Sequence, residues 1–452
     1  MADFRRANRR DDIRRPFLAG TGLRMGVPAM SSRGLRERLL LFLTVMGPGV
    51  ITAFADNDAG GIATYSAAGA KYGYSLLIVL FISILVLTVV QEISARTGAV
   101  TGRGLSDLIR ERYGVKWTFF AMAVLLVANM ATTVSELSGI ATSLEIFGLS
   151  RYISVPAVTL VVWWLVIKAD YARIEKVFFV LCITFFSYVI SGFVVSPPWH
   201  EVITAAVTPV LSHDPEYLLM VIGIIGTTIT PWGQFYVQAS IVDKGINAKN
   251  YMYTRWDVIV GAFFTGFIAF FIIVTTAATL HVNNIPIETA RDAALALEPL
   301  AGKYAAMLFA FGLFGASMLA SFILPLSTSY AICEAFGFER GVSKSHKDAP
   351  VFFGLYTIIL IVSAGLVLLP GLSLYHVMLT TQVVNGVLLP PVLIFMVLIA
   401  SNEKIMGQYR NSSLYNSVAW TFTAVVIALT LLLLVSSLAP GFVDQALLRL
   451  TV

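Results

Sequence analysis

The sequence carries little charge for its length. Only 13% of its 452 residues are Asp, Glu, Lys or Arg, and 57% are hydrophobic. Soluble globular domains contain about 25% charged residues, because ionic side chains must solvate their surface. The mean hydropathy of +0.81 points in the same direction. A soluble globular protein is therefore excluded, and most of the surface is expected to face lipid.

Other features that the sequence lacks exclude further classes. The 30 Phe, 17 Tyr and 7 Trp residues supply more apolar surface than an intrinsically disordered chain carries. The two cysteines, Cys182 and Cys333, lie in apolar stretches and provide neither a disulfide framework nor a CxxC zinc site. No HExxH motif begins at His200, and the apolar runs contain no Gly-rich phosphate loop. An enzyme is therefore not expected.

Long apolar runs dominate the sequence. A helix needs about 20 apolar residues to cross a hydrocarbon layer of about 30 Å. Eleven such runs occur, at roughly residues 39–71, 74–95, 117–147, 152–168, 176–198, 217–242, 256–280, 304–337, 351–370, 375–400 and 414–438. These runs predict an all-α integral membrane protein with about 11 transmembrane helices. A short external amphipathic helix is expected over residues 288–300.

Lys and Arg are distributed unevenly between the connections. Residues 1–38 contain ten Arg, and the later connections on the same side contain sixteen further Lys and Arg residues. The opposite side has only Lys71, Arg151, Arg291, Lys303 and Arg449. Because basic residues stay in the cytoplasm, this asymmetry predicts a multi-pass protein of the cell membrane with a cytoplasmic N-terminus and an extracellular C-terminus. Glu92, Glu145, Asp257 and Glu334 lie near predicted helix ends, where an interfacial position is expected.

Two of the predicted helices contain residues that break helices. The first contains GPGVITAFADNDAGG at residues 47–61, and the sixth contains GIIGTTITPWGQF at residues 223–235. Helix breaks at membrane depth need water, an ion or other protein groups to satisfy the backbone. Breaks at corresponding positions of two halves are typical of secondary transporters with a site near the bilayer midplane. A five-plus-five inverted repeat with one extra helix is therefore expected.

This interpretation divides the chain into a tail and one domain. The expected parts are a basic cytoplasmic tail at 1–38 and a single transporter domain at 39–452, with helices 1–5 at about 39–198, helices 6–10 at about 217–400 and helix 11 at about 414–438.

Asp56 and Asp58 lie in the first of these breaks. An ionised carboxylate at the bilayer centre costs about 3 kcal/mol, so two of them need a partner. No Lys or Arg lies inside a predicted apolar segment, which leaves a bound cation as the counter-charge. The alternative is that one Asp caps the second half-helix while the other is protonated. We expect the stretch Ala59–Gly61 to unwind, so that both carboxylates converge.

At these residues the sequence resembles the NRAMP family of divalent-metal transporters. The matching features are GPG at 47–49, Asp58, the TGxxL stretch from Thr101 to Leu105, Glu136, the pair Thr230–Pro231 and QVVNGVLLPP at 382–391. The resemblance covers nearly the whole chain and implies a LeuT-like fold. Two departures, Gly61 in place of an Asn of the family and Thr230–Pro231–Trp232 in place of Met-Pro-His, are similar to the NRAMP-related magnesium transporters.

The ligand chemistry favours a hard cation. With Met replaced by Thr230, the soft thioether is gone, and oxygen ligands suit magnesium and manganese. Mg²⁺ also retains several waters, for which Gly61 leaves room. We expect a partly hydrated Mg²⁺, or Mn²⁺, as the transported substrate. The candidate ligands are Asp58, carbonyls near Ala55 and Thr227, and also Asp56, Thr230 and Gln382. Alternatively, the hydroxyls of Thr227, Thr228 and Thr230 bond their own helix.

The resemblance also bears on coupling to protons. The family associates proton movement with the His after the sixth-helix Pro and with acidic residues of the third helix. Trp232 replaces that His and Thr133 replaces an Asp, whereas Glu136 remains. Weak or absent proton coupling is therefore expected, with Glu136 either a remaining relay or gate group or a buried, hydrogen-bonded acid. Trp232 is the second gate candidate.

Three alternatives remain at this point. The first is a proton-coupled Mn²⁺ or Fe²⁺ transporter. The second is a sodium-coupled amino-acid symporter on the same fold, although Asp56 and Asp58 would repel a substrate carboxylate. The third is a passive channel, which a ring of repeated subunits would suit better. The expected partners are a divalent metal ion and the lipid bilayer, with no nucleic acid, no prosthetic group and a monomer as the transport unit.

Overall fold

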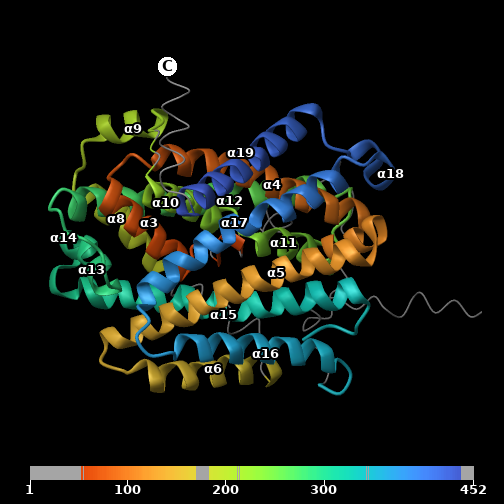
Figure 1. The fold of residues 1–452 in the computed structure, drawn as a ribbon, viewed down its shortest axis with the longest axis horizontal. Coiled ribbons are helices and arrows are strands. Elements are labelled where there is room, and N and C mark those ends of the chain that lie inside the picture. Colours follow the sequence, from red (N-terminus) through yellow and green to blue (C-terminus); the bar gives the residue numbers. More distant parts are fainter. Residues whose placement is uncertain are drawn as a thin grey trace, which may run out of the picture.

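The structure, a computed structural model, describes residues 52–168 except Phe54, and residues 183–438 except 211, 213, 343 and 345. The predicted tail at 1–38, the start of the first run and Cys182 lie outside the described residues. The described part is helical and contains no strand (Figure 1). Its long helices are α3 (Ala59–Tyr72), α4 (Leu77–Thr101), α5 (Leu105–Ile146), α6 (Arg151–Lys168), α10 (Pro215–Thr228), α11 (Pro231–Asp243), α12 (Tyr251–Thr276), α15 (Ala305–Phe336), α16 (Pro350–Val367), α17 (Leu374–Ala400) and α19 (Ser413–Leu438).

Shorter helical pieces connect these helices. They are η2 (Ile183–Phe185), α8 (Phe186–Val194), α9 (Trp199–Val207), the π-helical turn η3 (Ala277–His281), α13 (Ala290–Ala294), η4 (Leu295–Leu297), α14 (Glu298–Ala301), η5 (Gly302–Tyr304), α18 (Glu403–Met406) and η6 (Gly407–Tyr409). The predicted short helix at 288–300 is present as α13, η4 and α14.

Eight helical stretches of the described chain are long and apolar enough to cross a membrane. They are Leu77–Thr101, Leu105–Ile146, Pro215–Asp243, Tyr251–His281, Ala290–Phe336, Pro350–Val367, Leu374–Ala400 and Ser413–Val435. Two shorter apolar helices, Arg151–Ile167 and Ile183–Val194, lie where the fourth and fifth runs were predicted. Large apolar side chains such as Phe119 and Leu160 are 67% and 66% exposed, as residues that face lipid would be. The protein is a multi-pass membrane protein.

Two predicted helix bounds were wrong by several residues. α4 continues to Thr101, where Gly102 with φ 63° ends it, and α5 begins at Leu105 and bends at Gly114 with φ 79°. Arg96, which the sequence placed in a connection, therefore lies inside α4. It is 8% exposed, and its Nε lies 3.3 Å from Oε1 of Glu92, which is also buried. Glycines, rather than the end of the apolar run, end or bend these helices.

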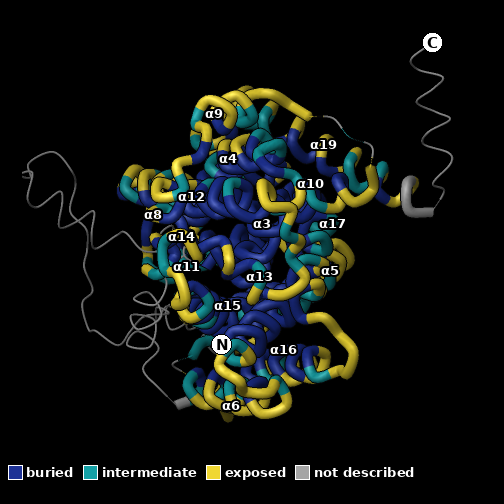
Figure 2. The backbone as a smooth tube through the Cα atoms, turned by 90° about the vertical axis from the view of Figure 1, so that its left-hand side faces the viewer, coloured by how far each residue is buried: buried dark blue, intermediate teal, exposed yellow. Residues whose placement is uncertain are grey.

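The broken helices lie at the centre of the bundle. Both views place α3, α10 and α11 among α4, α5, α12, α15 and α17, whereas α6 and α16 pack together at one edge (Figures 1 and 2). α10 approaches α17 through glycines: a Cβ built on Gly226 would lie 2.1 Å from the carbonyl oxygen of Gln382 and 2.3 Å from the nitrogen of Gly386. Small residues allow this close packing between membrane helices. The seam brings Gln382 beside the two breaks.

Candidate metal site at two helix breaks

The two predicted breaks are present and adjacent. Residues 52–53 and 55–56 are helical, Asn57 and Asp58 are not, and α3 starts at Ala59. α10 ends at Thr228, and α11 starts at Pro231 after two non-helical residues. The hydroxyl of Thr230 donates to Oδ1 of Asp56 at 3.2 Å, which joins the breaks. The expected unwinding of Ala59–Gly61 was wrong: these residues form the first turn of α3, and the break precedes them.

Asp58 caps α3 through one carboxylate oxygen, and its other oxygen lies outside the cap. Its Oδ1 accepts from the backbone N–H of Gly61 at 2.7 Å, as an N-cap residue does. Its Oδ2 is buried and accepts no hydrogen bond from a backbone, hydroxyl or amide donor of the described residues, but the carboxyl group of Glu136 interacts directly with the Asp58 side chain. The capping alternative is thus observed for one oxygen. The other oxygen is available to a metal ion, to water or to a proton shared with Glu136.

Three oxygen atoms lie close together beside Gly61. A Cβ built on Gly61 would lie 3.0 Å from Oγ1 of Thr227, 3.2 Å from the carbonyl oxygen of Asp56 and 3.3 Å from Oδ1 of Asp58. Oγ1 of Thr227 is also buried without a hydrogen-bond partner among the described residues. Carboxylate, carbonyl and hydroxyl oxygens from both broken helices therefore surround one point. Hard divalent cations prefer such a ligand set.

The predicted site residues are all buried, but their roles differ. Ala55, Asp56, Asp58, Thr227, Thr230 and Gln382 are each at most 1% exposed. The carbonyl that faces Gly61 is that of Asp56, whereas the sequence suggested a carbonyl near Ala55. Thr228 bonds its own helix, through the carbonyl of Ile224 at 2.7 Å. Among the three threonines, that alternative therefore applies to Thr228 only.

Gln382 lies next to the first turn of α3, but its oxygen is engaged. Its Oε1 accepts from Nδ2 of Asn385 at 2.9 Å, and its Nε2 would lie 1.7 Å from a Cβ built on Gly60. Nε2 has no hydrogen-bond partner among the described residues. Ligation of a metal by Gln382 would therefore require the bond to Asn385 to break or the amide to turn over.

The two coupling candidates border the breaks. Oε2 of Glu136 accepts from the backbone N–H of Ala59 at 3.2 Å, so this acid lies against the N-terminus of α3. Acids are favoured there by the helix dipole. Trp232, on the first turn of α11, is 1% exposed and packs edge-on against Tyr236 with ring centroids 5.7 Å apart. Glu136 thus bonds the N-terminus of α3, and the Trp232 side chain lies between the break at Thr230 and Tyr236 on the next turn of α11.

Sequence reasoning missed two neighbours of these residues. Nε2 of Gln91 donates to Oδ2 of Asp56 at 3.4 Å, and Asn385 orients Gln382. A buried amide within the second apolar run is a signal that could have identified Gln91. Within the described residues, no group of three or more His, Cys, Asp or Glu side chains could hold a metal. An ion here would therefore depend on backbone and hydroxyl oxygens as well as on carboxylates.

Comparison with known proteins agrees with the fold and the breaks. Residues 49–436 match the family described as natural resistance-associated macrophage protein-like, or Nramp. The divalent metal cation transporters MntH of Klebsiella pneumoniae and Granulibacter bethesdensis are each 27% identical. They match over 418 and 420 residues, 90% of this chain in both cases and 97% and 91% of the relatives.

Solved structures show the same architecture. A structure of the Eremococcus coleocola manganese transporter matches with a TM-score of 0.72 and 21% identity, covering 90% of this chain and 88% of that one. MhsT in complex with L-phenylalanine matches with a TM-score of 0.54 and 13% identity, covering 86% and 98%. The predicted LeuT-like fold, with broken helices 1 and 6, is confirmed. The chain belongs to the Nramp family, as its motifs indicated.

Proposed function

We propose that this protein is a secondary transporter that imports divalent metal ions across the cell membrane by alternating access. The proposed substrate is partly hydrated Mg²⁺, with Mn²⁺ carried as well. The observation that carries the proposal is the convergence of oxygens of Asp58, Asp56 and Thr227 beside Gly61, at the breaks of the two helices. The relatives named above are divalent metal cation and manganese transporters.

In this proposal, oxygen atoms of the two broken helices supply the negative charge and the ligands for the metal ion. The C-terminal ends of the first half-helix and of α10 carry partial negative charge, and both face the oxygens beside Gly61. Oδ2 of Asp58 would become a direct ligand, and water would complete the shell because Mg²⁺ gives up its waters reluctantly. Asp56, Thr230 and Gln382 would bind directly or through these waters. The three atoms nearest to a Cβ built on Gly61 are all oxygens, and none is sulfur. Oxygen ligands favour Mg²⁺ and Mn²⁺ over softer metals.

The membrane potential supplies enough energy for uptake. Moving one charge across 100 mV is worth about 2.3 kcal/mol, so a divalent ion gains about 4.6 kcal/mol. This corresponds to a concentration ratio of roughly a thousandfold or more at about 1.4 kcal/mol for each factor of ten. An abundant ion needs no second driving ion under these conditions. We therefore propose transport with weak or no proton coupling, with the N-terminus in the cytoplasm.

Uptake into liposomes that contain the full chain tests this function. With a negative potential inside, Mg²⁺ and Mn²⁺ are expected to enter at least about tenfold faster than in protein-free liposomes, whereas leucine is not carried. Ca²⁺, which prefers more ligands and a larger site, is expected to enter more slowly. Sodium-dependent leucine uptake would favour the symporter alternative. Tight binding of Fe²⁺ or Cd²⁺ to the protein, with no effect of Mg²⁺ on that binding, would overturn the choice of a hard cation.

The same liposomes report proton coupling through a pH-sensitive dye in the lumen. Mg²⁺ entry is expected to leave the luminal pH unchanged while the potential is clamped. The physical reason is that Trp232 and Thr133 cannot titrate where the resembled family has titratable groups, which leaves Glu136 without a relay. Luminal acidification that depends strictly on Mg²⁺ entry would contradict the prediction and favour the proton-coupled alternative.

A further inference from the structure

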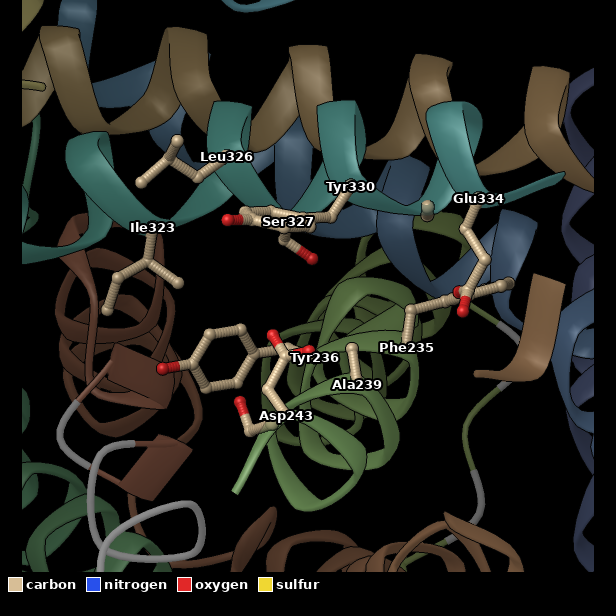
Figure 3. A pocket seen from close by; sticks show the side chains of 11 residues that line it. Phe235, Tyr236, Ala239, Asp243, Ile323, Leu326, Ser327, Tyr330 and Glu334 are labelled. Carbon is tan, nitrogen blue, oxygen red and sulfur yellow. The ribbon is translucent and has the colours of Figure 1, made fainter. Parts of the chain in front are cut away.

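A cavity lies between α11 and α15, beyond the two helix breaks. It has a volume of about 20 Å³, which is room for about one water molecule, and is partly open to solvent. Its α11 wall runs from Phe235 to Asp243, and its α15 wall from Ile323 to Glu334. Figure 3 shows that Ser327 and Tyr330 on α15 face Tyr236 and Asp243 on α11 across this space.

The cavity is close to the proposed metal site along α11. Thr230, which bonds Asp56, directly precedes α11, and Trp232 lies on its first turn. Tyr236, one turn further, lines the cavity and packs against Trp232. The Trp232–Tyr236 ring pair therefore lies between the metal site and the cavity. In the proposed orientation, the far end of α11 at Asp243 points to the cytoplasm.

Both walls offer oxygen atoms that are not already engaged. Ser327 is 6% exposed, and its Oγ is buried without a hydrogen-bond partner among the described residues. Asp243 is half-buried and makes no hydrogen bond or ion pair with any residue that the structure describes. A buried hydroxyl without a partner in a polar-lined space normally indicates water or an ion. Ser240 adds a hydroxyl to the α11 wall.

The second acid of the cavity is already neutralised. Glu334 accepts from Oγ of Ser106 at 2.8 Å and from the backbone N–H of Gly104 at 3.3 Å, and its Oε1 lies 3.1 Å from a guanidinium nitrogen of Arg340. Arg340 also acts electrostatically on Asp243, but its ion pair is with Glu334. Glu334 is therefore engaged, whereas the carboxylate of Asp243 has no direct ion pair among the described residues and is only partly compensated by Arg340.

We propose that this cavity is a second, weaker site for a hydrated divalent cation, with the carboxylate of Asp243 and the hydroxyl of Ser327 as its protein oxygens. Because the cavity is partly open to solvent, water can complete the coordination shell beside these two oxygens, as Mg²⁺ and Mn²⁺ favour. The site receives an ion that has left the central site past Trp232 and Tyr236. This inference depends on the proposed function, because the central site supplies the ion.

Mn²⁺ binding to the purified full chain, followed by electron paramagnetic resonance of the free ion, tests the second site. The wild type is expected to show two classes of site. Asp243→Asn should weaken the weaker class at least tenfold and leave the tighter class unchanged, and Ser327→Ala should weaken the same class about threefold. Asp58→Ala should remove the tighter class only. Asp107→Asn is the matched control: it removes an exposed acid outside the cavity, paired with Arg103, and should change neither class.

The variants separate this inference from the proposed function. Unchanged binding in Asp243→Asn, together with loss of the tighter class in Asp58→Ala, would overturn the second site and leave the central one in place. Unchanged binding in Asp58→Ala would overturn the central site. Retention of the tighter class in Asp243→Asn also shows that this variant is folded, so that a loss confined to the weaker class supports the proposal.

Discussion

Asp58→Asn is expected to abolish metal transport while the protein remains folded. Asn caps a helix about as well as Asp, so α3 keeps its first hydrogen bond to Gly61. The substitution removes the negative charge and one potential anionic ligand from the oxygens beside Gly61. We expect the rate of Mg²⁺ or Mn²⁺ uptake into liposomes to fall at least about 100-fold. This corresponds to a loss of roughly 2.7 kcal/mol of interaction free energy between the protein and the transported ion.

Asp58→Ala separates the cap from the charge. It removes both, so its transport should be as low as that of Asp58→Asn, and its free energy of unfolding should fall by a further ~1 kcal/mol. Asp107→Asn should transport at the wild-type rate. If Asp58→Asn transports normally and Asp58→Ala fails only because it unfolds, Asp58 is a capping residue alone, and the metal site lies elsewhere.

Gly226→Ala is expected to destabilise the fold strongly, although it adds only one methyl group. The new Cβ would meet two backbone atoms of α17, 2.1 Å from the oxygen of Gln382 and 2.3 Å from the nitrogen of Gly386. Backbone atoms cannot move aside as the end of a side chain can, so α10 and α17 must separate. Overpacking of a core costs about 1–3 kcal/mol and occasionally more, and the upper end is expected here. The measurement is the thermal unfolding of the purified protein in detergent.

Gly354→Ala is the matched control for this packing prediction. Gly354 lies within α16, and a Cβ there would have no atom within 4 Å. Because Ala favours a helix over Gly by about 1 kcal/mol, this variant should unfold at the wild-type temperature or slightly above it. Equal melting temperatures of Gly226→Ala and Gly354→Ala would show that the close approach of α10 and α17 is wrong.

The all-helical fold and the order of its long apolar helices could be predicted because each helix depends on local composition. Each long helix that the structure describes coincides with an apolar run that is long enough to cross the bilayer. The breaks in the first and sixth helices were equally visible, since Pro231 and two acids two residues apart are costly inside a membrane helix. Helix ends were less accessible, because Gly102 and Gly114 act through backbone conformation that hydropathy does not report.

The contacts within the site could not be predicted in the same way. The sequence identified Asp56, Asp58 and Thr227, but not that the carbonyl of Asp56 faces Gly61 or that Gln91 donates to Asp56. The first depends on the backbone conformation of the break, and the second depends on how α4 packs against it. Gln382 is a similar case, because its oxygen is engaged by Asn385, one turn along α17. Residue types suggest possible ligands, whereas tertiary packing decides which atoms of those residues are available.

The proposed transport function requires that a divalent cation bind beside Gly61, between Asp58, the carbonyl of Asp56 and Thr227. The most direct measurement is the anomalous scattering of Mn²⁺ in crystals of the full chain, with Asp58→Asn crystals as the reference. One strong anomalous peak is expected within direct or water-mediated reach of these three oxygens, and it should disappear in Asp58→Asn. The absence of a peak beside Gly61 at saturating Mn²⁺, or a peak there that persists in Asp58→Asn, would contradict the proposed function.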